Sequence, residues 1–451
     1  MNNTFLRFAR AIAILYALLA PLRSVAQEIA FHQYQLQNGI TVILHEDHRL
    51  PTVAVNLWYA VGSKDESAGR SGFAHLFEHL MFMGTHTVPE GSFDQIMERN
   101  GGSNNASTAK DRTNYFESGP SHLLEMFLFL EADRLKSLGR DITQEKLDLQ
   151  RDVVRNERRQ NYENRPYATA YLRMWEELYP EGHPYHHPVI GSHEDLESAT
   201  LDDVRSFFER YYVPSNTSLV VAGDFDSAQA KTWITRYFGS IPAADRPTPI
   251  TAELVTLPSS KTLRLTDRVT LKKTLLVYHS PPFYAPGDAE LDILSSILGD
   301  RKTGRLYRHL VYEKQLAQEV SAFQWSSQLG SIFVIDATAR PGVELADIQR
   351  EIDVVITNLD KQPPTLRGCE RARNGITTSF WSELESVSGR ADLLNRYQFY
   401  FGDPGAVTKD RQRYDDVTPT SVLEWAKKIL SRERLVVEIV PEPSPTGGEE
   451  K

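Results

Sequence analysis

Short segments with alternating hydrophobic and polar residues open the first part of the chain, and longer segments with helical spacing follow. The stretch YQLQNGITVILHED predicts two strands joined by an Asn-Gly turn, and VAVNLWYAVGS alternates like a third strand. Residues 121–140 and 143–161 carry apolar positions at helical spacing, and Arg165-Pro166 follows the second of these segments. LDDVRSFFERYY predicts a further helix, and SLVVAGDF predicts a closing strand.

The same order of elements recurs in outline in the second part of the chain. KTLLVYHSPPF is strand-like, AELDILSSILG helical, GSIFVIDATAR a strand, LADIQREIDVVITNLDK a helix and RLVVEIVPEP a closing strand. Residues 241–258, with Pro242, Pro247 and Pro249, are typical of a linker. We therefore predict an α+β fold of two homologous domains, 27–240 and 259–443, each a mixed β-sheet flanked by helices.

Both ends of the chain differ in composition from these domains. Arg7 and Arg10 precede an apolar run, AIAILYALLA, that is too short to cross a bilayer, and Ser24-Val25-Ala26 forms a small-x-small cleavage pattern. Residues 1–26 therefore predict a signal peptide. The tail 444–451, SPTGGEEK, is expected to be disordered. After cleavage, no other segment is apolar enough to span a membrane.

The net charge and the cysteine count each exclude one feature. The 451 residues carry a formal net charge of −10, which argues against a nucleic-acid partner. Cys369 is the only cysteine, so an intrachain disulfide is impossible although the chain is predicted to be exported.

The stretch FAHLFEHLMFMGT, residues 73–85, predicts a helix that is bounded by Gly72 and Gly84 and has two different faces. At about 100° per residue, one arc is apolar and consists of Phe73, Leu76, Phe77, Leu80 and Met81. The opposite side carries His75, Glu78 and His79, with Phe82 among them. Packing in a core explains the first face but not the second.

Two histidines at positions i and i+4 lie on one helical face and can bind one Zn²⁺ ion. Zinc lowers the pKa of bound water toward about 7, and Glu78 is placed to accept the proton as hydroxide attacks a carbonyl. The order His-x-x-Glu-His is itself a catalytic signature. The third ligand must come from elsewhere, and the charged helix that follows leaves the choice open among Glu145, Asp148, Asp152, Glu157 and Glu163.

These motifs and their surroundings resemble the pitrilysin/insulinase family of zinc metallopeptidases, in particular its short-chain, mitochondrial-processing-peptidase-like members. The matching stretches are GRSGFAHLFEHLMFMGT, NGGSNNASTAKDRTNYF, VVRNERRQNYENRPY and HPYHHPVIGSHEDL. The resemblance implies that His75, His79 and Glu157 are the zinc ligands and that Glu78 is the general base.

The resemblance also implies roles around the metal. A glutamate that supports the site in the family is replaced here by Gln150, which we expect to point toward the metal without charge. SNNAST matches the edge strand on which the family lays a peptide, so Asn105 and Ala106 are expected to bind substrate through the backbone. Phe82 is a third expected substrate contact.

The second half departs from family members that act alone. Those carry an arginine and, seven residues later, a tyrosine that stabilise the tetrahedral intermediate, whereas this chain has Val311 and Gln318 there. Arg305, Tyr307 and Arg308 lie nearby in the sequence but at different helical positions. The resemblance thus implies a zinc-bearing subunit of a heterodimer, with a homologous non-zinc partner that supplies the missing pair.

Two alternatives to this zinc endopeptidase are open: a catalytically silent assembly subunit, and a metallopeptidase that is active as a homodimer or monomer. Asn105-Ala106-Ser107 is also a glycosylation sequon, and a glycan there would block the expected peptide site. We therefore expect a bacterial periplasmic location rather than a eukaryotic secretory route.

Overall fold

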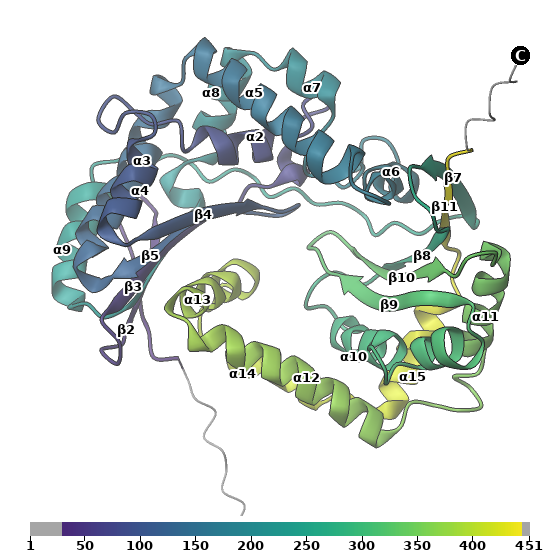
Figure 1. Ribbon diagram of the computed structural model, residues 1–451. Coiled ribbons are helices and arrows are strands. Elements are labelled where there is room, and N and C mark those ends of the chain that lie inside the picture. The colour runs from purple at the N-terminus through teal and green to yellow at the C-terminus, as the bar shows by residue number, and fades with distance from the viewer. Residues whose placement is uncertain (1–28, 444–451) are drawn as a thin grey trace, which may run out of the picture.

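The computed structural model describes residues 29–443 and contains two mixed β-sheets with helices around them (Figure 1). The predicted signal peptide and the predicted disordered tail lie outside the described residues. The strands of the first sheet are β1 (His32–Gln35), β2 (Thr41–Glu46), β3 (Thr52–Tyr59), β4 (Ser103–Thr108), β5 (Thr113–Pro120) and β6 (Thr217–Gly223). Those of the second are β7 (Lys261–Asp267), β8 (Lys273–Ser280), β9 (Ala317–Trp325), β10 (Ser331–Ala339) and β11 (Leu435–Pro441).

The two sheets repeat one topology. Their orders are β1-β2-β6-β3-β5-β4 and β7-β11-β8-β10-β9. In each sheet the closing strand, β6 or β11, pairs in parallel with one neighbour and antiparallel with the other. The predicted α+β fold with two homologous halves is confirmed. The edge strand β4 of the first sheet corresponds to the edge strand β9 of the second.

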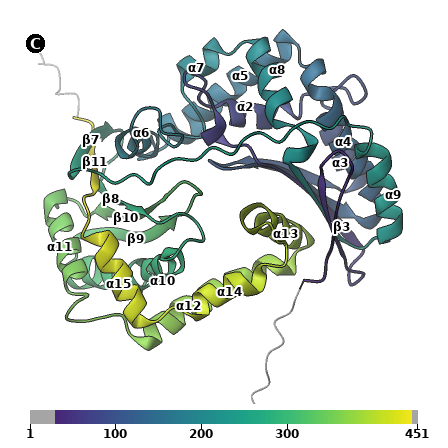
Figure 2. The same cartoon turned by 180° about the vertical axis from the view of Figure 1, so that it is seen from behind.

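Helices cover both sheets (Figures 1 and 2). The first half contributes α2 (Phe73–Leu80), α3 (Ser92–Asn100), α4 (Leu124–Asp141), α5 (Gln144–Arg158), α6 (Thr169–Leu178), α7 (His193–Ser198), α8 (Leu201–Tyr211) and α9 (Ser227–Phe238). The second contributes α10 (Asp288–Gly299), α11 (Leu345–Thr357), α12 (Leu366–Glu385), α13 (Val387–Phe401), α14 (Val407–Asp415) and α15 (Pro419–Leu430). Among the described residues, none of these helices is both long and apolar enough to cross a membrane.

One helix of each half packs against the sheet of the other half. Ala391 and Leu394 of α13 pack against Ile43 and Val220 of the first sheet, and Figure 1 shows α13 beside that sheet. Trp175 and its neighbours on α6 pack in turn against the second sheet. Residues 241–258, the predicted linker, form neither helix nor strand. The boundary between the halves in the sequence is therefore not a boundary between separate cores. A helix buries its apolar side against whichever sheet face is free.

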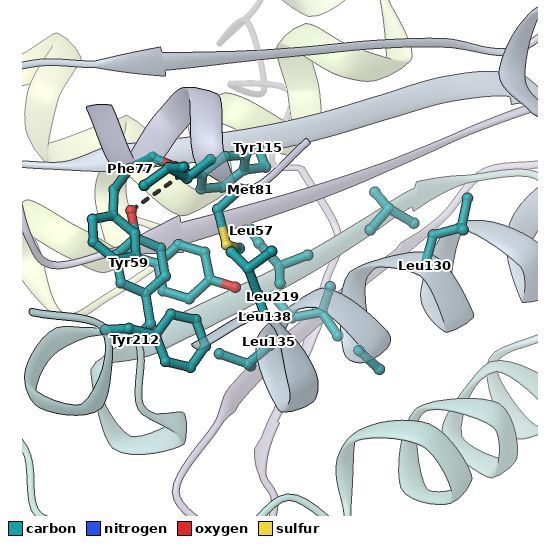
Figure 3. Packing of buried hydrophobic residues seen from close by; sticks show 14 of the residues in the cluster. Leu57, Tyr59, Phe77, Met81, Tyr115, Leu130, Leu135, Leu138, Tyr212 and Leu219 are labelled. Carbon is teal, nitrogen blue, oxygen red and sulfur yellow. Dashed lines mark hydrogen bonds between the residues drawn. The ribbon is translucent and has the colours of Figure 1, made fainter. Parts of the chain in front are cut away.

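The helix with the two faces is shorter than its sequence pattern predicts. It ends at Leu80, and the chain then turns through Met81 to Gly84, whose φ of +71° suits glycine. The predicted apolar arc is buried: Phe77 and Met81 lie among Tyr59, Tyr115 and Tyr212 (Figure 3). This packing holds the opposite, polar face in a fixed orientation.

Candidate metal centre

The start of α2 is fixed by a carboxylate from outside the helix. Glu66, whose side chain is fully buried, accepts hydrogen bonds from the backbone N–H groups of Gly72 (2.9 Å) and Ala74 (2.7 Å). These are groups that the helix itself leaves unpaired. Gly72 has φ +90°, and a Cβ there would lie 2.9 Å from the carbonyl oxygen of Ile190. Burial raises the pKa of Glu66 well above its ordinary value. No sequence pattern predicts this cap, because Glu66 lies seven residues before Phe73, the first residue of the helix.

Replacing Glu66 with Ala removes both of these hydrogen bonds. We expect the free energy of unfolding to fall by about 1–3 kcal/mol, the usual cost of leaving buried donors unpaired. Urea unfolding of the variant measures this, with the exposed Glu209→Ala as control. Equal stability of the two variants would show that Glu66 does not hold the helix.

The structure brings His75, His79 and Glu157 together. Each offers one ligand atom, and these atoms all lie within 4.8 Å of one another. Glu157 Oε2 lies 3.7 Å from His75 Nε2 and 3.2 Å from His79 Nε2. Donor atoms about 2.1 Å from one tetrahedral zinc ion lie about 3.4 Å apart, so the observed spacing fits such an ion. All three side chains are partly buried.

The electrostatics of the cluster also suit a cation. Burial, with the neighbouring His79, lowers the pKa of His75 to about 4, so its imidazole is neutral and keeps a lone pair for a metal. The hydrogen bond with His79 lowers the pKa of Glu157, so this carboxyl group is ionised. Two imidazoles and one carboxylate are a donor set that Zn²⁺ prefers.

The other four carboxylates that the sequence left open do not join the cluster. Asp148 pairs with Arg151, and Asp152 lies 3.7 Å from Arg155. Glu163 contacts Arg158 and His193 at 3.0 and 2.9 Å. Glu145 is exposed. Of the five carboxylates, Glu157 is the one that groups with His75 and His79.

Glu78 lies beside the cluster on the same helix and is half-buried, as the three clustered residues are. Its Oε2 accepts a 2.6 Å hydrogen bond from the hydroxyl of Thr108, the last residue of β4. Burial raises the pKa of Glu78, and the hydrogen bond from Thr108 opposes that rise. Sequence reasoning did not single out Thr108, since the contact joins residues 30 positions apart.

The remaining predicted residues are near the cluster but differ in their contacts. Gln150 Nε2 lies 2.7 Å from Met83 Sδ and donates to none of the three clustered side chains. Phe82 is half-buried against Phe93 and Tyr115, with ring centroids 5.7 and 6.0 Å away. Its role as a substrate contact stays a prediction.

The strand β4 has a free edge. Among the strands of residues 29–443 it pairs only with β5, and Asn105 is exposed on it. The Ala106 N–H donates to Asn105 Oδ1 at 2.8 Å. A side chain thus occupies the backbone donor that an added peptide strand would use.

Val311 and Gln318, which replace the arginine–tyrosine pair, have neither a positive charge nor a phenolic hydroxyl. Val311 packs against the second core, and Gln318 is exposed on β9. The nearby arginines are held locally: Arg305 donates to the carbonyl oxygen of Pro363 at 2.8 Å, and Arg308 pairs with Glu313 at 2.8 Å.

Comparison with known proteins agrees with this geometry. Residues 41–179 match the family described as "Insulinase (Peptidase family M16)", and residues 198–376 match "Peptidase M16 inactive domain". The "Zinc protease PqqE" of Helicobacter pylori is 32% identical over 384 residues, which cover 84% of this chain and 86% of the relative. The chain belongs to peptidase family M16.

Solved structures of this family share the fold. A protease from Helicobacter pylori has a TM-score of 0.85 at 30% identity, covering 92% of this chain and 100% of that chain. The periplasmic protease PqqL from Escherichia coli has a TM-score of 0.74 at 18% identity. This match covers 91% of our chain but 47% of PqqL, and at this identity it shows the M16 fold alone.

Proposed function

We propose that this M16 protein is an exported zinc endopeptidase that cleaves peptides or unfolded segments. The observation that supports it best is the convergence of His75, His79 and Glu157 on one point beside Glu78. A bound zinc ion would supply Lewis acidity and an acidified water. Glu78 would accept a proton from the attacking water and return it to the leaving amine, so the peptide bond would be hydrolysed without a covalent enzyme intermediate.

The substrate would bind as an added strand. The free edge of β4 offers backbone groups at Asn105 and Ala106, and a peptide carbonyl would replace Asn105 Oδ1 as the acceptor for the Ala106 N–H. Backbone hydrogen bonds require an extended peptide but hardly distinguish one side chain from another. An extended, unfolded segment is therefore the substrate class that suits this site.

We further propose that the active site is composite. Val311 and Gln318 cannot donate the charged and phenolic hydrogen bonds that stabilise an oxyanion. A homologous partner subunit without the zinc motif would supply an arginine and a tyrosine. The signal-peptide pattern of residues 1–26 supports a periplasmic location for this pair.

The test uses the purified mature chain, an unstructured fluorogenic peptide, and the homologue encoded in the adjacent reading frame if that gene lacks His-x-x-Glu-His. We expect one zinc ion per chain, little hydrolysis by the chain alone, and a rise of about 10²-fold or more when the partner is added. Full activity of the single chain would overturn the composite site and favour a monomer or homodimer. A chain that binds no zinc and stays inactive with the partner would instead be a silent assembly subunit.

A further inference from the structure

The hydroxyl of Thr108 selects one oxygen of the Glu78 carboxylate. Thr108 Oγ1 donates to Oε2 at 2.6 Å, and no hydrogen bond to Oε1 occurs within residues 29–443. We propose that Thr108 is a positioning residue that holds Glu78 in the rotamer in which Oε1 is free to accept the proton of the attacking water. This inference rests on the proposed function, in which Glu78 is the general base.

The backbone of Thr108 is held firmly enough to act in this way. Thr108 pairs with Thr113 across the β4–β5 hairpin, and Ala109 N–H donates to Arg112 O at 2.9 Å. Arg112 in turn donates to the carbonyl oxygen of Ser107 at 2.7 Å. The buried Thr113 hydroxyl donates to Val61 O at 2.9 Å, which ties the hairpin to the end of β3.

The turn of the hairpin is also fixed from outside. Backbone N–H groups of Ser63 and Lys64 donate to Ala109 O (3.2 Å) and Lys110 O (3.0 Å). Gly62 allows this approach, since a Cβ there would lie 2.4 Å from Lys110 O. Asp111 accepts a 2.9 Å hydrogen bond from the backbone of Gln328 in the second half. The hairpin is thus held by hydrogen bonds to both halves of the chain.

The same strand would hold both the substrate and the base. Asn105 and Ala106, the proposed peptide contacts, precede Thr108 by three and two residues on β4. The same strand, β4, would therefore position both the added peptide and the carboxylate of Glu78. Misplacement of a reacting group by about 1 Å costs on the order of 100-fold in rate, so a hydroxyl that fixes the carboxylate has a large effect on turnover.

The experiment compares Thr108→Val, which keeps the shape of the side chain without its hydroxyl, with Thr108→Ser, which keeps the hydroxyl. Thr235→Val is the matched control, because Thr235 donates one hydrogen bond to Lys231 O on the outer helix α9. Zinc content, melting temperature, kcat and KM are measured in the assembly that hydrolyses the peptide. For Thr108→Val we expect kcat to fall about 10- to 100-fold with KM and zinc content unchanged, and for Thr108→Ser we expect most of the rate to return.

Three outcomes would overturn the proposal: an unchanged kcat in Thr108→Val, an equal loss in Thr108→Val and Thr108→Ser, or a change in KM alone. Thr108→Ala serves the same comparison if the valine variant does not fold. Glu78→Gln, measured in parallel, distinguishes an error in the role of Glu78 from an error in the role of Thr108. If Glu78→Gln keeps its turnover, the assigned base is wrong; if it is inactive while Thr108→Val is normal, only the role of Thr108 is wrong.

Discussion

Replacing Glu78 with Gln is expected to lower kcat by about 10²–10⁴-fold and to leave zinc content and stability unchanged. Glutamine has nearly the same shape and can still accept the hydrogen bond from Thr108, but its amide does not take a proton from water. The effect should therefore appear in the chemical step alone. Steady-state kinetics on an unstructured peptide, together with metal analysis, measure both quantities.

The matched control for this variant is Glu145→Gln, which changes an exposed glutamate on α5. It should have the activity and the zinc content of the unmodified chain. A Glu78→Gln variant that turns over at the normal rate would remove Glu78 from the reaction. A variant that also loses its zinc would mean that Glu78 is a ligand instead of a base.

The second large effect concerns Glu157. Replacing it with Ala leaves two imidazoles from one helix and removes the only carboxylate of the cluster. Loss of a group that merely supports a ligand typically weakens metal binding 10- to 100-fold, so loss of this ligand should weaken it by more than about 100-fold. Competition with a zinc-sensitive chelating dye measures the affinity, and hydrolysis should fall in parallel.

Glu163→Ala provides the comparison for this variant, since Glu163 is on the same segment of chain but pairs with Arg158 and His193. Its zinc affinity should stay within about threefold of the unmodified value, as is usual for a residue that touches neither ligand nor metal. If Glu163→Ala lost zinc and Glu157→Ala kept it, the choice of the third ligand would be wrong.

Local periodicity was sufficient to predict the fold and one face of the site. The apolar arc of α2 fixes which side of that helix is buried, so the opposite position of His75, Glu78 and His79 follows from the sequence. The recurrence of strands and helices likewise indicated two similar sheets, which the structure confirms.

What could not be predicted depends on contacts between distant segments. Periodicity leaves five carboxylates open on and near α5, and only the family resemblance singled out Glu157. The contact of Thr108 with Glu78, the cap that Glu66 forms on α2, and the packing of α13 on the first sheet all depend on tertiary structure. Gln150 shows the same limit: its place on α5 suggested the metal, but its side chain lies against Met83.

The proposed function depends on the binding of one zinc ion by His75, His79 and Glu157. The most direct measurement is anomalous diffraction at the zinc absorption edge from crystals of the purified chain grown with equimolar zinc. We expect a single strong peak about 2.1 Å from one atom of each of the three side chains. A zinc peak elsewhere, or none among these residues at full zinc supply, would contradict it.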